Sequence, residues 1–337
     1  MEIKIKATAV TPLCQISGVE ETMIDGSKVS YTAIQKMPMY VPIGDEKVFV
    51  KLPIYTANGF RGALRRVSTR ILYDKAIEKD ISLGKNAIVI GKSFHAQNAG
   101  GNVSYTNCPI GKEREIREAN PVVSYLGVSL AVSGKVSVSP LFPKEKDPDG
   151  NLVYPIAKSK NDNGGYYAKC SSIKVQYKVD DMERRSENSK IFTFQTLEEW
   201  DEVVKNSREN KDVENLNASH VISTEEVHAG TDFYGSIVST DKLTDIEKGL
   251  LISSLIKLVK KQLGAIGSHG RGKMNYELTF GKSVIRSKWN DFLSNASVSV
   301  SLDDDASKCV AAFEEWLENI DEKNIQISEM LDRINEK

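Results

Sequence analysis

The sequence predicts an α+β fold, and two kinds of hydrophobic periodicity predict it. Apolar and polar residues alternate over 1–10, 121–140, 173–179 and 274–280, which is the two-residue period of half-buried strands. Two other segments, beginning near residues 57 and 245, place apolar residues three and four positions apart, as helices do when they bury one face. Long polar stretches separate these segments, so we expect one core with large insertions.

The composition is that of a globular chain. Its 337 residues are 40% hydrophobic and 27% charged, enough for one large domain or two small ones. The four cysteines and four histidines are scattered without metal-ligand spacing, so we expect reduced thiols, no structural zinc and no cofactor. No basic-then-apolar leader begins the chain, and its longest apolar run is short and lysine-rich. We therefore expect a cytoplasmic protein with no membrane partner.

Charge is distributed unevenly along the chain. Residues 291–337 hold 12 acids and four bases, a net charge of −8, whereas the formal net charge of the whole chain is −1. The first 290 residues therefore carry +7, and the body is basic while the tail is acidic. This distribution permits a polyanionic partner without requiring one.

In the first half, residues 1–10 read as a core strand, followed by a polar loop over 18–51 with a short hairpin across 37–50. A helix should run from Thr56 to about residue 79. Beyond it, the segment 84–120 is rich in Gly, Asn and Ser and then in charges of alternating sign, which suggests an inserted, partly helical subdomain. The alternation over 121–140 predicts strands.

The helix that begins near Thr56 carries an unusual set of cations. Its buried stripe and its arginines lie on different faces, because apolar residues recur every three or four positions. The stripe is Phe60, Leu64, Val67 and Ile71, and the arginines are Arg61, Arg65, Arg66 and Arg70. Cations in a first turn oppose the helix dipole, so an anion bound there would explain the first three, although a solvated face would look the same. Arg70 reads as solvated.

The second half holds a tyrosine- and lysine-rich segment. Residues 166–179 predict an exposed hairpin, which suits either base stacking or self-association. Residues 183–217 are charged, with a helix expected near 197–204 and then a linker. Residues 221–239 predict a strand that contains His228, Ala229, Gly230 and Thr231, where His228 suits a sheet-edge position.

A glycine-rich loop follows the second strongly patterned helix. Thr244 and Glu247 form a capping box at the start of that helix, which should run to Leu263. The loop over 263–273 contains four glycines interleaved with His269, Arg271 and Lys273. Glycines allow positive φ and close approach to a ligand, so the loop suits a phosphate backbone, although the glycines could serve only a turn. Beyond Gly281 we expect a mostly helical extension that packs on a neighbouring surface.

The order strand, helix, strands, then strand, helix, strand is that of a ferredoxin-like or RNA-recognition-type sheet. With its motifs, the chain resembles the RAMP superfamily of CRISPR proteins, and among them the backbone subunit of class 1 effector complexes, most of all the type IV version. Three segments carry the resemblance: Asn58–Arg66 (Asn-Gly-Phe-Arg-Gly-Ala-Leu-Arg-Arg), His228–Thr231 (His-Ala-Gly-Thr) and Leu263–Lys273.

The resemblance implies a hand-shaped protein. Its palm would span 1–285, interrupted by a finger-like insertion over 84–125 and a β-hairpin thumb over 140–190, and an acidic helical extension would follow over 286–337. Copies would stack along a crRNA in a helical filament with other CRISPR effector subunits, each thumb displacing a base, and would present the guide for pairing with target DNA or RNA. The residues that it implies for RNA binding are Asn58, Arg61, Arg65, Arg66, His228, Ser268, His269, Arg271 and Lys273.

Two catalytic alternatives remain open beside a purely binding role. Type III backbone subunits, which this chain resembles, cut target RNA with an acidic residue between the first strand and helix, and Asp25 lies in that part of this chain. A turn would explain Asp25 equally well. A guide-RNA-processing endoribonuclease would use His228 or His269 as acid or base. We expect no enzyme activity and assign no catalytic or metal-binding residue.

Overall fold

The structure is a computed structural model. It describes residues 1–24, 27–84, 86–101, 110–128, 132–158, 165–178, 220–265, 267, 270–289 and 295–328. The chain divides into two compact units. The larger unit comprises Met1–Ile16, Ile34–Ser171 and Val227–Lys337, and the smaller comprises Ser17–Ala33 and Ser172–Glu226. None of the described helices combines the length and hydropathy that a membrane span requires.

The larger unit is built on an eight-stranded sheet. Its strands are β1 (Glu2–Ala9), β6 (Val136–Val138), β7 (Phe142–Lys146), β8 (Leu152–Val153), β13 (Asp232–Ser239), β14 (Met274–Phe280), β15 (Ser283–Trp289) and β16 (Ala296–Ser301). The order is β16-β15-β14-β1-β13-β7-β8, and β6 also pairs with β13. The pairings between these strands are antiparallel.

The centre of this sheet has the ferredoxin-like arrangement. Helix α1 (Ala57–Glu78) follows β1, and helix α7 (Asp245–Leu258) joins β13 to β14. The run β14-β1-β13-β6/β7 therefore places the fourth, first, third and second strands of a β-α-β-β-α-β unit side by side. The predicted α+β palm fold is confirmed.

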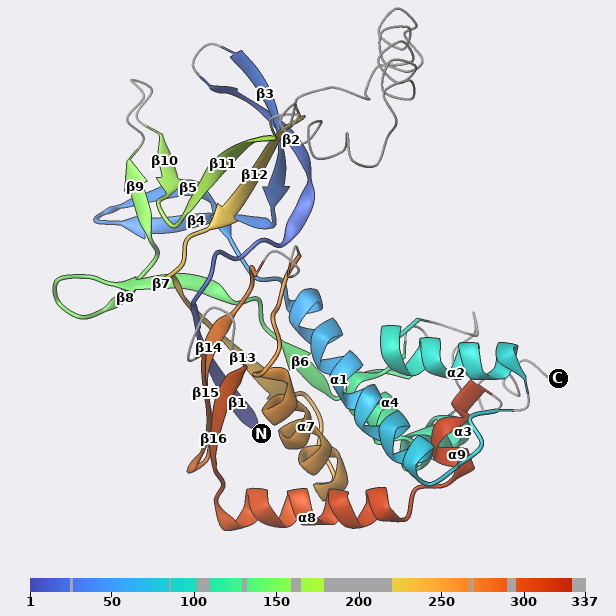
Figure 1. Cartoon of the computed structure of the whole chain (residues 1–337). Helices are drawn as coiled ribbons and strands as arrows, with labels where there is room; N and C mark the ends of the chain where they lie inside the picture. The colour runs from blue at the N-terminus through green and yellow to red at the C-terminus, as the bar shows by residue number, and fades with distance from the viewer. Residues whose placement is uncertain are drawn as a thin grey trace, which may run out of the picture. The chain divides into compact units, whose positions relative to one another are not determined.

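The alternation in β1 sets the two faces of the sheet. Ile3, Ile5, Ala7 and Ala9 are buried and lie in the main core with the inner stripes of α1 and α7, while the intervening polar residues face the other side. Figure 1 shows α1 and α7 side by side against the sheet. The buried stripe predicted for α1, from Phe60 to Ile71, is confirmed.

Three helices fill the insertion that follows α1. They are α2 (Ala87–Ala99), α3 (Ile110–Ala119) and α4 (Pro121–Leu126). The helical content predicted for 84–120 is present, but the strand prediction was wrong over 121–126. Asn120 caps α4 by accepting from Val123 N, and Pro121 occupies the first turn, where a missing N–H costs nothing. These local signals outweigh the apolar alternation.

The segment expected to be a polar loop is mostly strand. Residues 36–53 form the hairpin of β4 (Lys36–Ile43) and β5 (Glu46–Pro53), as predicted. Residues 16–34, however, form β2 (Ile16–Ile24) and β3 (Ser27–Ile34). They belong to the sheet β11-β12-β3-β2 of the smaller unit, with β11 (Ser171–Lys178) and β12 (His220–Val227). Pairing within a sheet decides these strands, because their own periodicity is weak.

The predicted hairpin over 166–179 was also wrong. Strand β10 (Tyr166–Ala168) pairs with β9 (Ile156–Lys158), whereas β11 pairs with β12. The two halves of the supposed hairpin therefore belong to different sheets. The helix expected near 197–204 lies outside the described residues.

The C-terminal part continues the sheet before it becomes helical. Strands β15 and β16 occupy most of 283–301, so the helical extension predicted from 286 begins only with α8 (Asp304–Glu318) and α9 (Glu322–Ile325). The alternating burial of β15 is a strand signal that the helical interpretation overlooked. Helix α8 packs on α7 as expected: a Cβ on Gly249 would lie 2.0 Å from Cys309 O.

Candidate functional site

One short segment, Ala9–Gln15, holds together the three motifs that the sequence analysis singled out. Its residues make backbone hydrogen bonds to the glycine-rich loop through Val10 N to Lys273 O at 2.8 Å, Gly272 N to Pro12 O at 3.0 Å and Ala265 N to Cys14 O at 2.7 Å. The same segment meets the His-Ala-Gly-Thr turn. Gly230 N donates to Ala9 O at 2.7 Å, and Ala9 N donates to Thr231 O at 3.0 Å.

The third motif joins this segment at the N-terminus of α1. Thr56 caps the helix by accepting from Gly59 N. Gln15 clamps the cap from both sides, since its Nε2 donates to Thr56 Oγ1 at 2.7 Å and its Oε1 accepts from Thr56 N at 2.8 Å. A Cβ at position 59 would lie 2.3 Å from Gln15 Nε2, so a larger residue there would displace the Gln15 side chain from the cap. Segments more than 200 residues apart in sequence are thus fixed to one another around the start of α1.

A cavity of about 570 Å³ opens beside α1 on the side of its first two arginines. We call it the arginine cavity. It is lined by Asn58, Arg61, Gly62, Arg65, Ala99, Gly100, Leu126, Gly127, Val128, Val132, Ser133 and Gly134. Its volume lies in the range of small-molecule binding sites. The predicted residues Asn58, Arg61 and Arg65 therefore share one site.

Two guanidinium groups converge in this cavity without a carboxylate. Arg61 Nη2 and Arg65 Nη2 both donate to Leu126 O, the carbonyl at the end of α4, the latter at 2.8 Å. Among the described residues neither arginine has an acidic partner. Arg61 Nε and Arg65 Nη1 are buried and have no hydrogen-bond acceptor. Buried N–H donors normally find acceptors, so these two arginines have hydrogen-bonding capacity that the protein leaves unused.

The walls of the cavity let the guanidiniums approach the backbone. A Cβ on Gly100, which has φ +70°, would lie 2.9 Å from Arg65 Cζ, and one on Gly134 would lie 2.7 Å from Arg61 Nη2. Larger residues at either position would displace the arginines. Glycine at 100 and 134 thus keeps the cavity open around the two cations.

The surroundings of Arg65 disfavour the charged form of its guanidinium. The residue is 6% exposed, and burial lowers the pKa of its guanidinium to about 10, assisted by the positive charge of Arg61. Two like charges in a poorly solvated site repel each other, and a phosphate between them would relieve both desolvation and repulsion. The arrangement favours binding a dianion or a phosphodiester over leaving the site empty.

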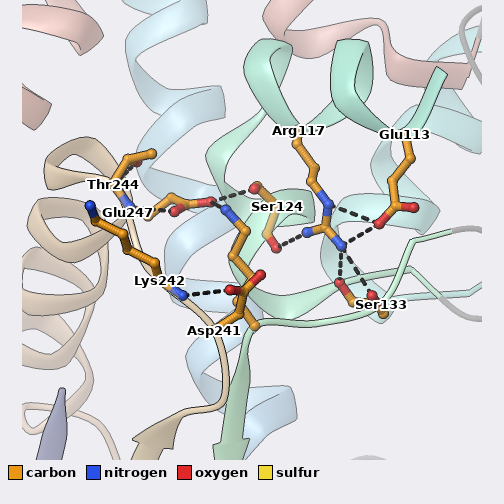
Figure 2. A network of polar contacts seen from close by, with 9 residues as sticks. Glu113, Arg117, Ser124, Ser133, Asp241, Lys242, Thr244 and Glu247 are labelled. Carbon is orange, nitrogen blue, oxygen red and sulfur yellow. Dashed lines mark hydrogen bonds and ion pairs between the residues drawn. The ribbon is translucent and has the colours of Figure 1, made fainter. Parts of the chain in front are cut away.

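A polar network holds the far wall of the cavity in place (Figure 2). Arg117 on α3 donates through Nε to Glu113 Oε1 at 2.9 Å, through Nη1 to Ser124 O at 2.7 Å and through Nη2 to Ser133 O at 2.7 Å. Ser124 precedes Leu126 and Ser133 precedes Gly134. A single planar guanidinium therefore fixes both chain segments that face the arginines.

A buried carboxylate continues this network to α7. Glu247, 3% exposed, accepts from Lys135 Nζ at 2.8 Å, from Thr244 N at 2.7 Å and from the Ser124 hydroxyl. The capping box predicted for Thr244 and Glu247 is confirmed. The same carboxylate thus begins α7 and anchors the segment that leads to the cavity.

The glycine-rich loop adopts the backbone that its glycines were predicted to allow. Gly264, Gly270 and Gly272 have φ of +93°, +76° and +82°. A Cβ on Gly264 would lie 2.5 Å from Cys14 O, and one on Gly272 would lie 1.9 Å from Leu263 O. The absence of a Cβ at these two positions therefore lets the loop backbone pack directly against the backbone of Cys14 and Leu263. Helix α7 ends at Leu258, so Gly264 is not its cap as the helix prediction had implied.

The cations of this loop are placed differently from one another. Lys273 is 4% exposed, with its ammonium 5.1 Å from the centre of the Trp289 ring. Arg271 is partly exposed. Ser268 and His269 lie outside the described residues, as does Asp25, the candidate for target cleavage.

Arg66 and His228 lie apart from the arginine cavity. Arg66 is exposed, and its charge acts on Tyr55, whose pKa burial raises to about 12 against the influence of Arg66 and of a hydrogen bond from the Gly264 backbone. The Arg66 guanidinium lies near Gly62, since a Cβ built at that position would be 3.4 Å from Arg66 Nη1. His228 is exposed in the turn after β12, where its backbone N donates to Cys170 O at 2.8 Å.

Sequence reasoning missed the residues that complete the cavity. Gly100, Leu126 O, Gly134 and the supporting Arg117 come from segments that were described only as an insertion and as strands. A signal was available for the glycines, since Gly100-Gly101 and Ser133-Gly134 interrupt patterned segments. No sequence signal predicts which carbonyl two arginines will share. Among the described residues, no group of three His, Cys, Asp or Glu side chains is placed to hold a metal ion.

Comparison with known proteins finds similarity at the level of structure. No family model matches the chain, and no curated protein matches it. A solved structure described as "Type IV-B CRISPR Complex" aligns with a TM-score of 0.45 at 14% identity, covering 83% of this chain and 90% of that one. At that TM-score the likeness carries no functional conclusion, and function is inferred below from this chain's own residues.

Proposed function

We propose that the chain is the guide-RNA-binding backbone subunit of a CRISPR effector complex, that copies of it assemble along a crRNA, and that the assembly presents the guide for pairing with target nucleic acid. The role is one of binding, and the proposal assigns no catalytic residue. It rests on the arginine cavity together with the resemblance of the three motifs to the RAMP superfamily.

The observation that carries the proposal is the pair of guanidiniums at the cavity, one buried on Arg65 and one half-buried on Arg61. Arg61 and Arg65 keep two unused N–H donors in a glycine-walled cavity with no acidic partner among the described residues. A sugar–phosphate backbone offers acceptor oxygens and negative charge, and it carries no sequence of its own to be read. Such a site would hold a guide by its backbone and leave its bases available to pair.

The clustering of the motifs around Ala9–Gln15 supports the proposal further. It brings the glycine-rich loop and the His-Ala-Gly-Thr turn to the start of the helix that carries Arg61, Arg65 and Arg66. A strand passing the start of α1 would therefore meet residues from more than one motif. Three motifs dispersed over more than 200 residues would serve one ligand.

The test is whether the protein carries guide RNA through these arginines. The chain would be purified from cells that express a CRISPR array, and its absorbance ratio, RNase sensitivity and bound RNA would be measured. We expect co-purified RNA of defined length in a large particle. Arg61→Ala and Arg65→Ala should each weaken RNA binding about tenfold or more, since each removes charged hydrogen bonds to phosphate.

Arg70→Ala is the matched control on the same helix. Arg70 is exposed and pairs with Asp74 at 2.6 Å, so its loss should leave RNA binding unchanged. A clean monomer without nucleic acid, even with the array present, would overturn the proposal. RNA binding that the Arg61 and Arg65 variants retain in full would show that the cavity is not the guide site.

A further inference from the structure

The β4–β5 hairpin has an exposed aromatic face that the arginine cavity does not use. Tyr40 and Phe49 face each other across the hairpin, with exposed fractions of 69% and 52%, and their ring centres lie 5.5 Å apart at an interplanar angle of 64°. Exposing two large rings is unfavourable in water. Scattered apolar side chains are common on protein surfaces, but adjacent exposed rings that form one apolar surface are a candidate contact site.

The other face of the hairpin is anchored, so the exposed rings are held firmly. Val41, Val50 and Leu52 are buried against Ala168 and Cys170, with Tyr154 and Ile156 packed alongside. Since side chains alternate between faces, burial of this set fixes Tyr40 and Phe49 outward. The hairpin therefore presents a preformed aromatic surface, with little conformational entropy to lose on binding.

Cations flank the rings on that face. The register places Lys51 beside Pro38 and Lys47 beside Pro42, one pair on each side of the Tyr40–Phe49 pair. No carboxylate partner for Lys47 or Lys51 exists among the described residues. Glu46, the one acid of the hairpin strands, pairs with Ile43 and so belongs to the opposite face.

The prolines argue against a protein strand adding to this hairpin. Alternate residues of a strand direct their N–H groups to the same edge, so Pro38 and Pro42 remove two donors from the row that includes Tyr40. An edge so depleted is a poor template for β-addition. A ligand that stacks on the face and neutralises the lysines suits it better.

We propose that the Tyr40–Phe49 face is a second nucleic-acid contact, which stacks on unpaired bases while Lys47 and Lys51 contact the adjacent phosphates. Aromatic rings with interleaved cations bind single strands in this way without reading their sequence. The proposal rests on the chain being a nucleic-acid binder, but it concerns a different surface from the arginine cavity. It adds recognition of bases to a guide site that recognises phosphates.

The test compares an oligouridine strand with an abasic strand of equal length, each fluorescently labelled, bound to the full chain. Wild type should bind the base-bearing strand about tenfold more tightly, a typical gain from stacking. Tyr40→Ala combined with Phe49→Ala should abolish that preference and leave abasic binding unchanged. Tyr40→Phe and Phe49→Tyr should keep it, and Ile77→Ala, an exposed apolar residue on α1, should not alter it.

Site-specific cross-linking gives an independent readout. Oligouridine with 5-iodouridine should cross-link to peptides that contain Tyr40 or Phe49. Equal wild-type binding of both strands, or a preference that survives the double alanine variant, would overturn this inference and leave the guide-binding role intact. Failure of wild type to bind either strand would overturn both. A change only in oligomeric state would assign the face to a second copy instead.

Discussion

At the scale of single residues, the start of α1 contains a buried cation that lowers the stability of the fold. Arg65 is almost fully buried, beside Arg61, and shares only a carbonyl with it. Its pKa falls to about 10 because burial disfavours the charged form. A shift of that size corresponds to a cost of about 3 kcal/mol at neutral pH. A protein that needed only a helix here would place an apolar residue at position 65.

The sign of this effect follows from proton linkage. In the unfolded chain the Arg65 guanidinium has its ordinary, higher pKa, whereas in the folded chain its pKa is about 10. The unfolded state therefore binds more protons between those values, and the free energy of unfolding rises with pH across that window. Below about pH 10 the Arg65 guanidinium is charged in both states, and the full cost of burying that charge lowers the free energy of unfolding.

Arg65→Met should therefore stabilise the RNA-free protein. Removing the buried charge recovers up to about 3 kcal/mol, less about 1 kcal/mol for the lost hydrogen bond to Leu126 O. Denaturant unfolding of wild type and variant would measure the gain, with exposed Arg70→Met expected within about 0.5 kcal/mol of wild type. The variant should also lose the stabilisation that added phosphate or RNA gives to wild type. A less stable variant would contradict the conclusion that the buried charge of Arg65 destabilises the folded protein.

At the scale of elements, the cavity depends on how the α3–α4 insertion is held. Its far wall consists of Leu126–Val128 and Val132–Gly134, which contribute backbone and one serine but no charge. Arg117 and the Lys135–Glu247 pair fix that wall from behind, at 2.7–2.8 Å. The cations lie on α1, and the carbonyl that orients them lies on α4. Precise placement of the insertion is thus a condition for binding.

Arg117→Ala should weaken RNA binding without touching the cavity. It removes hydrogen bonds to the carbonyls of Ser124 and Ser133, so amides over 121–135 should exchange with deuterium faster than in wild type. RNA affinity should fall several-fold. Arg117→Lys should not restore it, because an ammonium cannot reproduce the planar fork. Arg114→Ala, which changes an exposed residue on the same helix, is the control. Unchanged deuterium exchange in Arg117→Ala would show that Arg117 has no positioning role.

The elements also show what sequence could predict and why. Helix α1, the capping box of α7 and the alternation of β1 are local patterns, and each was predicted because 3.6- and two-residue periods are visible in one segment. The pairing of β3 and β11 with β12 joins segments distant in sequence and was missed, whereas β2 and β3, which are neighbours in the chain, were missed because their own periodicity is weak. The arginines of the site were predicted from their conflict with the helix dipole. Their shared carbonyl and the glycine walls of the cavity come from tertiary packing and could not be predicted from the sequence.

At the scale of the whole molecule, each copy offers the cations of the arginine cavity and an aromatic hairpin face, while acids concentrate in the last 47 residues. Under the proposed function these surfaces bind RNA through its backbone and bases without reading sequence. Any stretch of guide should therefore serve as well as any other. Binding would then be limited by length, because one strand can offer the same contacts repeatedly.

The number of copies bound should accordingly increase with RNA length. Mass photometry of the purified chain with single strands of increasing length should show stepwise added mass at constant spacing, and the same steps for unrelated sequences. Because each copy neutralises further phosphates, affinity should fall as salt rises, with a slope that Arg61→Ala and Arg65→Ala each reduce by about one. Arg70→Ala should keep both the steps and the slope. A single copy per strand at every length would contradict assembly along a guide, even if that copy bound through the arginine cavity.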